Sequence, residues 1–173
     1  MDVTEYLDIL DDEGTVIGKA SQKEVYKKKY NHRIVHVLVI NTKTREVYLQ
    51  RRAETKSFLP GYYCTSAGGH VHAGETHEQA ARREMYEEIG LKSPLREVHR
   101  FVFESDKHRR FIVLFVTAAT EGFDFRDGEV AAGSFYSLDE AISLAGKGEK
   151  IHPQLDPCLR WLYQNQNKVF VRF

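Results

Sequence analysis

The chain has 173 residues, of which 42% are hydrophobic and 29% are charged, and 25 lysines and arginines balance 25 aspartates and glutamates. This length predicts a single well-packed domain, and the zero net charge gives no global attraction to nucleic acids or membranes. The opening MDVTEYLDILDDEG lacks the basic and apolar regions of a signal peptide, and the longest apolar run, FIVLFV, is too short to span a membrane. The two cysteines, Cys64 and Cys158, do not make a disulfide framework and have no metal-ligand spacing, so we expect a protein of the reducing cytoplasm.

The first third of the chain predicts a hairpin, a helix and two strands. The segments YLDIL and TVIGKA flank a turn-like Asp-Asp-Glu-Gly sequence, which is typical of a β-hairpin. Ser21 followed by Glu24 predicts the start of a short basic helix. IVHVLVIN and VYLQRR predict two strands joined by a turn over residues 41–46. Residues 1–30 should therefore form an extension ahead of the core.

Residues 76–90 predict one well-delimited helix. Thr76 followed by Gln79 is a capping-box pattern, so the helix should begin at Thr76. Gly90 is the residue at which it should end. At 100° per residue, the helix presents an apolar stripe made of Ala81, Met85 and Ile89.

Three glutamates share the adjacent face of this helix. Glu84, Glu87 and Glu88 fall within one turn of each other. Carboxylates this close repel one another and raise each other's pKa unless a cation neutralises them. A hard divalent ion suits them, because Mg²⁺ prefers oxygen ligands and commonly bridges to substrate phosphates. For the EMYEE segment alone, a solvated helix face is the simpler alternative. Arg83 can pair with Glu87 or reach back to Glu75.

The second half of the chain predicts another pair of strands and two more helices. The strands are LREVHRFVFESD and HRRFIVLFVTAAT. Ser137 with Glu140 caps one helix, and Asp156-Pro157 begins a carboxy-terminal helix that passes through Trp161. Strands interleaved with helices predict an α/β sandwich with a mixed sheet. The apolar end, VFVRF, can pair as an edge strand, seal a homodimer or cover the core.

Residues 69–91, GHVHAGETHEQAARREMYEEIGL, fill every defining position of the Nudix box, G-x5-E-x7-R-E-U-x-E-E-x-G-U, in which U is apolar. The chain therefore resembles the Nudix hydrolases. The resemblance implies an α/β/α sandwich, which agrees with the mixed β-sheet and the amino-terminal hairpin extension expected from the residues. The expected division of this single domain is a hairpin and short helix over 1–30, a core over 31–150, and a carboxy-terminal helix and tail over 151–173.

The resemblance also implies an activity and roles for individual residues. The expected reaction is hydrolysis of a diphosphate linkage in a nucleoside diphosphate derivative or a related organic diphosphate, with Mg²⁺ or Mn²⁺ as cofactor. The implied metal ligands are Glu84, Glu87, Glu88 and Gly68. The implied catalytic residues are Arg83, Glu87, Glu88 and Glu129. Of these, Glu87, Glu88 and Glu129 are the candidates to take a proton from the attacking water.

The segment before the box narrows the resemblance. QRRAETKSFLPGYYCTSAGGHVHAGE is similar to the equivalent stretch of the isopentenyl-diphosphate isomerases and the hydrolases related to them. The similarity implies that the substrate diphosphate is bound by Arg51, Arg52, Lys56 and Gly69. His36 and His70 fall where the isomerases use histidines to bind a metal.

Two departures favour a hydrolase over an isomerase. The isomerases use a cysteine before the Gly-His pair, and Gly68 stands at that position here. They also use a glutamate on a later strand, and HRRFIVLF contains none. Since proton transfer at carbon needs both groups, isomerase activity is the second hypothesis for the function. A third reading is a domain that senses a nucleotide without cleaving it, which the complete set of box glutamates disfavours.

Overall fold

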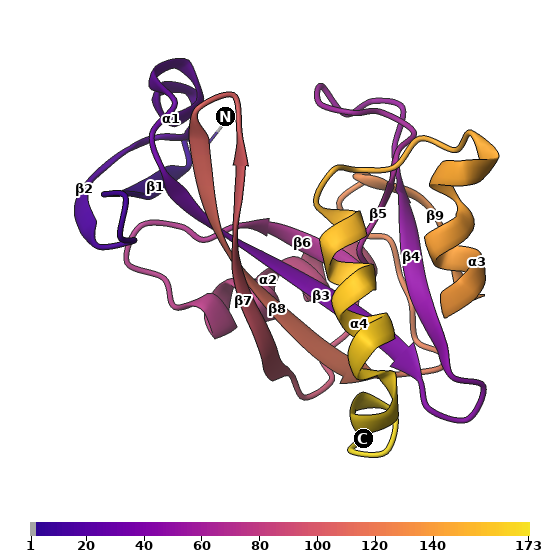
Figure 1. Ribbon diagram of the computed structural model, residues 1–173. Helices are drawn as coiled ribbons and strands as arrows, with labels where there is room; N and C mark the ends of the chain where they lie inside the picture. The colour runs from indigo at the N-terminus through magenta and orange to yellow at the C-terminus, as the bar shows by residue number, and fades with distance from the viewer. Residues whose placement is uncertain (1–2) are drawn as a thin grey trace.

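The structure, a computed structural model that describes residues 3–173, is built on a two-stranded sheet and a seven-stranded sheet (Figure 1). The elements of the amino-terminal extension are β1 (Tyr6–Leu10), β2 (Val16–Ser21) and α1 (Gln22–Lys28). The strands β1 and β2 pair antiparallel, which confirms the predicted hairpin. The Ser21 side chain caps α1 by accepting the N–H of Glu24, as the sequence predicts.

The large sheet is mixed. Its strands are β3 (His32–Asn41), β4 (Glu46–Arg52), β5 (Tyr63–Cys64), β6 (Ala67–His70), β7 (Arg96–Ser105), β8 (His108–Ala118) and β9 (Val130–Ser137). They run in the order β5-β4-β3-β8-β7, with β6 also beside β3 and β9 also beside β4. Strands β3 and β8 pair in parallel, and the other pairs named here are antiparallel.

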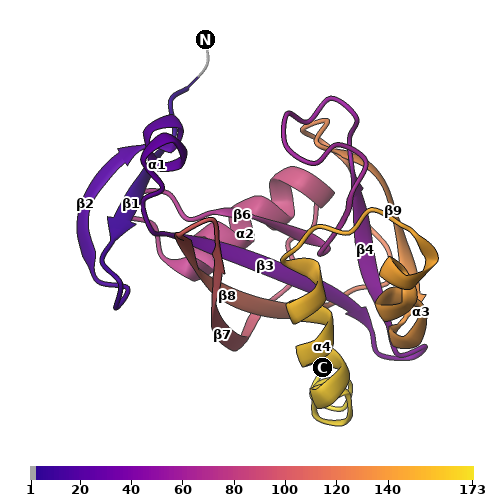
Figure 2. The same cartoon turned by 45° about the horizontal axis from the view of Figure 1, so that its top comes forward.

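Helices cover both faces of the large sheet (Figures 1 and 2). They are α2 (His77–Ile89), α3 (Leu138–Ser143), a 3₁₀ turn η1 (Ala145–Lys147) and α4 (Leu155–Val169). Because successive strand residues point to opposite faces, Val37 of β3 packs in the cluster with α2, whereas Leu38 packs in the cluster with α3 and α4. The expected α/β/α sandwich is confirmed.

Three strands were not predicted from the sequence: β5, β6 and β9. The first two are only two and four residues long, and β6 contains a Gly-Gly pair, so neither shows an alternating pattern. Gly133 interrupts β9, where a Cβ would lie 2.0 Å from Tyr48 Oη. These strands form because β3 and β4 offer them unpaired edges, which is a tertiary effect rather than a local one.

The carboxy-terminal VFVRF does not form an edge strand. Helix α4 continues to Val169, and Val169 and Phe170 are buried in the α4 cluster. Covering the core is therefore the alternative that the structure supports for the start of this segment. The homodimer stays a prediction.

The structure also bears on the expectations for the two cysteines and for membrane-spanning segments. Cys64 and Cys158 are both free and buried. Among residues 3–173, the structure contains no helix with the length and apolar character needed to cross a membrane. The cytoplasmic location stays a prediction.

Candidate functional site

Helix α2 carries the predicted carboxylates and is fixed at both ends. The Thr76 side chain accepts the N–H of Gln79 at 3.1 Å, and the Gln79 side chain accepts the N–H of Thr76 at 2.9 Å. Gly90 ends the helix with φ at 75°, and its N–H donates to Tyr86 O. A Cβ on Gly90 would also lie 2.8 Å from Asp124 Cβ. The predicted cap and stop are both confirmed.

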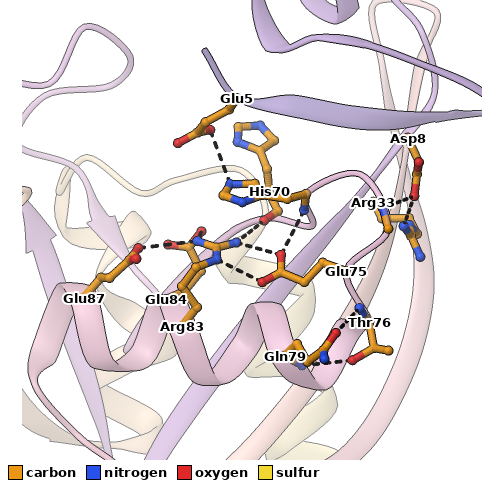
Figure 3. Close-up of polar contacts among 12 residues, drawn as sticks. Glu5, Asp8, Arg33, His70, Glu75, Thr76, Gln79, Arg83, Glu84 and Glu87 are labelled. Atoms are coloured by element: carbon orange, nitrogen blue, oxygen red, sulfur yellow. Dashed lines mark hydrogen bonds and ion pairs between the residues drawn. The ribbon is translucent and has the colours of Figure 1, made fainter. Parts of the chain in front are cut away.

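Arg83 lies at the centre of the polar contacts around α2 (Figure 3). Its guanidinium donates to both carboxylate oxygens of Glu75 at 3.0 Å and to the His70 carbonyl at 2.9 Å. On its other side it donates to Glu84 at 2.7 Å and to Glu87 at 3.4 Å. The two pairings that the sequence left open, with Glu75 and with Glu87, thus occur together. Arg83 ties the helix carboxylates to the loop before α2.

The three helix glutamates occupy different environments. Glu88 is 5% exposed and accepts a hydrogen bond from the side-chain amide of Gln50 on β4. Burial raises the pKa of Glu88 well above its ordinary value, and the charge of Glu84 adds to the rise. Burial also raises the pKa of Glu84 to about 7, although Arg83 opposes the rise. The Glu87 side chain is half exposed.

The loop before β9 brings two more carboxylates to the site. Glu129 pairs with Lys56 at 2.5 Å, and its charge contributes to the raised pKa values of Glu84 and Glu88. Asp127 was not predicted from the sequence. Its side chain accepts the N–H of Glu129 at 2.9 Å, and its charge also raises the pKa of Glu88. The Asp-Gly-Glu turn of residues 127–129 was the available signal.

Three basic side chains, Arg51, Arg52 and Lys56, are predicted to bind the substrate diphosphate. The two arginines hold the loop that carries Lys56. Arg51 Nε donates to the Gly61 carbonyl at 3.4 Å. Arg52 donates to the Phe58 carbonyl from Nε at 3.1 Å and from Nη2 at 2.9 Å. The loop between these contacts contains Lys56, which reaches the site carboxylates through Glu129. Substrate binding by these cations stays a prediction.

Gly68 and Gly69 of β6 allow close approaches that a side chain would prevent. A Cβ on Gly69 would lie 2.3 Å from Glu84 Oε1. A Cβ on Gly68 would lie 2.7 Å from both His36 Nδ1 and the Val35 carbonyl. The reason for glycine is therefore steric at both positions, and at Gly69 the close neighbour is a predicted metal ligand.

The two predicted metal-binding histidines are already engaged by the protein. His36 is buried, with Nδ1 at 2.6 Å from Thr65 Oγ1 and Nε2 at 2.7 Å from Gln154 Oε1. Both ring nitrogens of His70 contact side chains of α1. A ring whose two nitrogens have hydrogen-bond partners has no free lone pair aimed at an ion, so a structural role fits His36 better than the predicted ligand role.

The buried His36 makes stability depend on pH in a predictable direction. Burial lowers the pKa of His36 from 6.5 to about 4. As the pH falls, the His36 imidazole is therefore protonated in the unfolded chain before it is protonated in the folded protein. The contribution of neutral His36 to the free energy of unfolding is fully present above pH 6.5 and is lost toward pH 4. We expect the advantage of the wild type over His36→Gln to shrink by about 3 kcal/mol from pH 7 to pH 4. Calorimetry in EDTA measures the free energy of unfolding of both proteins at each pH. A difference between them that stays constant with pH would contradict a buried, neutral His36.

The chemistry of the carboxylates fits a divalent cation. Within the described residues, 3–173, no three His, Cys, Asp or Glu side chains already converge on one point that would hold an ion. The reason is visible in the contacts, because Arg83 holds Glu84 and Gln50 holds Glu88. The donor set consists of oxygen atoms whose charges raise one another's pKa, which is the set that Mg²⁺ and Mn²⁺ prefer.

Comparisons with known proteins identify a family and a shared fold. A family model described as the NUDIX domain matches residues 30–162. The Escherichia coli K12 protein named uncharacterized Nudix hydrolase YfcD is 36% identical over 138 residues, which cover 79% of this chain and 76% of that protein. The crystal structure of DR0079 from Deinococcus radiodurans has a similar fold, with a TM-score of 0.81, 23% identity, and coverage of 92% of this chain and 99% of that one. An Ap4A hydrolase of C. elegans also shares the fold, with a TM-score of 0.58, 18% identity, and coverage of 79% and 98%.

Proposed function

This chain belongs to the Nudix family and is a hydrolase, and we propose that it is a metal-dependent pyrophosphohydrolase. Its substrate would be a nucleoside diphosphate derivative or a related organic diphosphate. The observation that carries the proposal is the group of carboxylates around α2, in which Glu88 is buried, the Glu84 side chain is 13% exposed, and the charge of Glu129 raises the pKa of both. Bringing several carboxylates together in a partly buried site is costly unless cations join them, so such a group favours a site for a metal ion that binds phosphate oxygens over a role in fold stability.

The protein side chains divide the work as follows. Glu84, Glu87, Glu88 and the Gly68 carbonyl would hold the cation. Once bound, Mg²⁺ or Mn²⁺ supplies neutralisation of phosphate charge and lowers the pKa of water. Arg83 holds Glu84 and Glu87 in place through its anchor on Glu75.

Other residues would accept the proton of the attacking water and bind the negative charge of the substrate. The attacking water would give its proton to Glu87, Glu88 or Glu129. Lys56, which pairs with Glu129, brings a positive charge beside these carboxylates, where an incoming diphosphate needs one. Arg51 and Arg52 would act on the diphosphate directly or through the loop that they support.

Packing at Gly68 favours hydrolysis over isomerisation. The isomerase reading needs a cysteine at this position, but a Cβ here would lie 2.7 Å from His36 Nδ1. We therefore assign the similarity around Arg51, Arg52 and Lys56 to the hydrolases related to the isopentenyl-diphosphate isomerases. It concerns diphosphate binding and not proton transfer at carbon.

A turnover assay tests the proposed function. The protein is incubated with Mg²⁺, with Mn²⁺ or with EDTA, and with nucleoside diphosphates, nucleoside triphosphates, sugar nucleotides, dinucleoside polyphosphates or isopentenyl diphosphate. We expect release of phosphate or mononucleotide that depends on the metal and stops in EDTA. Formation of dimethylallyl diphosphate would instead identify an isomerase. Tight nucleotide binding without any product would identify a sensor.

A further inference from the structure

The anchors that hold Arg83 both belong to the loop of residues 70–75, which we call the box loop. Arg83 donates to the His70 carbonyl at 2.9 Å and to Glu75 at 3.0 Å. The Glu75 carboxylate is fixed in turn by the N–H of His72 at 3.0 Å. The direction in which Arg83 presents its remaining donors to the site therefore depends on how firmly the box loop is held.

The amino-terminal extension, most of which precedes the family match over residues 30–162, holds the box loop from outside. The N–H of Ala73 donates to the Tyr6 carbonyl at 2.7 Å. The N–H of Gly74 donates to the Asp8 carboxylate at 3.1 Å. Figure 3 shows β1, which carries Asp8, passing over the box loop and α2. The hairpin thus binds the part of the loop that follows His70.

Helix α1 holds the remaining anchor, His70, by its side chain. Gln22 Nε2 donates to His70 Nδ1 at 3.3 Å, so the neutral ring carries its proton on Nε2. That proton is donated to the Tyr26 hydroxyl, at 2.7 Å. The Tyr26 ring meets the His70 ring edge to face, with centroids 5.6 Å apart and an angle of 82°.

This support matters because His70 is the last residue of a short strand. It forms the final pair of the β6 ladder, opposite Ile34. Beyond that pair, the N–H of Val71 still donates to the Arg33 carbonyl at 3.1 Å, and the rest of the box loop is held by its turn contacts, by Arg83 and by the amino-terminal extension. Fixing the His70 ring restricts the rotation of its peptide unit, whose carbonyl is the acceptor that Arg83 uses.

We propose that Tyr26 is a positioning residue of the hydrolytic site. It orients His70, the His70 carbonyl orients Arg83, and Arg83 orients Glu84 at 2.7 Å. The importance of this chain of contacts for catalysis rests on the proposed function. Through these contacts, the amino-terminal extension helps to position residues of the site.

Tyr26→Phe tests the proposal, because it removes one hydroxyl and keeps the ring. Tyr26 is 42% exposed, so the core is left intact. We expect kcat to fall about 10-fold with KM unchanged, as for other residues that orient a metal ligand from behind. In NMR spectra of the metal-free protein, the Arg83 Nε–H signal should shift and exchange faster with water. Mn²⁺ binding, followed by electron paramagnetic resonance, should weaken several-fold.

Tyr163→Phe is the matched control. Tyr163 also lies on a helix, is 44% exposed, and its hydroxyl has no hydrogen-bond partner among residues 3–173. It should change none of these readouts. If Tyr26→Phe does not fold, Gln22→Ala removes the contact on the other ring nitrogen and is measured in the same way.

The outcomes separate the two ideas. An unchanged Arg83 signal in Tyr26→Phe would overturn the positioning role, whether or not kcat falls. If the wild type hydrolyses no diphosphate, the proposed function fails. The Arg83 signal and the Mn²⁺ affinity then decide the positioning role by themselves.

Discussion

Glu88→Gln should lower kcat for diphosphate hydrolysis by about 10³-fold, because it removes the carboxylate charge that we propose binds the cation. Glu88 is 5% exposed and is held by the Gln50 amide. Glutamine keeps the shape and an oxygen that accepts from Gln50, so the fold should survive. Steady-state rates with saturating Mg²⁺ on the best substrate of the panel measure the effect.

The same substitution should stabilise the metal-free protein at high pH. The pKa of Glu88 is raised in the folded state, so the folded protein resists losing this proton. The wild type is therefore penalised once pH rises above the ordinary value of 4.5, and glutamine removes the penalty. In EDTA, the Tm of Glu88→Gln should exceed that of the wild type at pH 8, and the difference should shrink toward pH 4.

Glu78→Gln is the control for this pair of measurements. Glu78 lies in the first turn of the same helix, and its side chain is 57% exposed and paired with Arg82. Rate and Tm should both stay close to the wild type, since an exposed helix pair contributes about 0.5 kcal/mol. Full activity in Glu88→Gln would remove this residue from the metal site.

Gly69→Ala should lower kcat/KM by about 10²-fold through steric displacement of Glu84. The added Cβ would lie 2.3 Å from Glu84 Oε1 and 2.4 Å from its Cδ. Glu84 must then leave its place beside Arg83, which also orients Glu87. The loss should appear in metal affinity as well as in rate, because the displaced group is a proposed metal ligand.

Gly146→Ala is the matched control for Gly69→Ala. Gly146 lies in η1, and a Cβ there would meet nothing within 4 Å. This variant should keep wild-type kcat/KM and Mn²⁺ affinity. If Gly69→Ala binds Mn²⁺ as tightly as the wild type, the close approach of β6 to Glu84 is not what shapes the site.

Features of α2 could be predicted from the sequence because they are local. The cap at Thr76 and the stop at Gly90 depend on residues within a few positions. The different solvent exposure of Glu87 and Glu88 also follows from helix geometry. Glu88 lies about 60° from the apolar Met85 around the helix axis, whereas Glu87 lies about 160° away. Glu88 is accordingly the buried one.

The remaining parts of the site depend on contacts between distant segments, which spacing alone does not encode. Gln50 meets Glu88 across 38 residues, and Tyr26 meets His70 across 44. His36 was matched to a metal-binding position by similarity, but its surroundings on other elements, Thr65 and Gln154, decide its role. Partners of this kind become visible only once the sheet places them together.

Hydrolysis in ¹⁸O-labelled water tests the central claim most directly. The wild type and Glu88→Gln are incubated with Mg²⁺ and the best substrate of the panel in H₂¹⁸O, and the products are weighed by mass spectrometry. A pyrophosphohydrolase places one ¹⁸O atom in a phosphate product at each turnover, and Glu88→Gln and EDTA should both suppress it. Consumption of the substrate without ¹⁸O in any product, or labelling that persists in Glu88→Gln, would contradict hydrolysis at the carboxylates of α2.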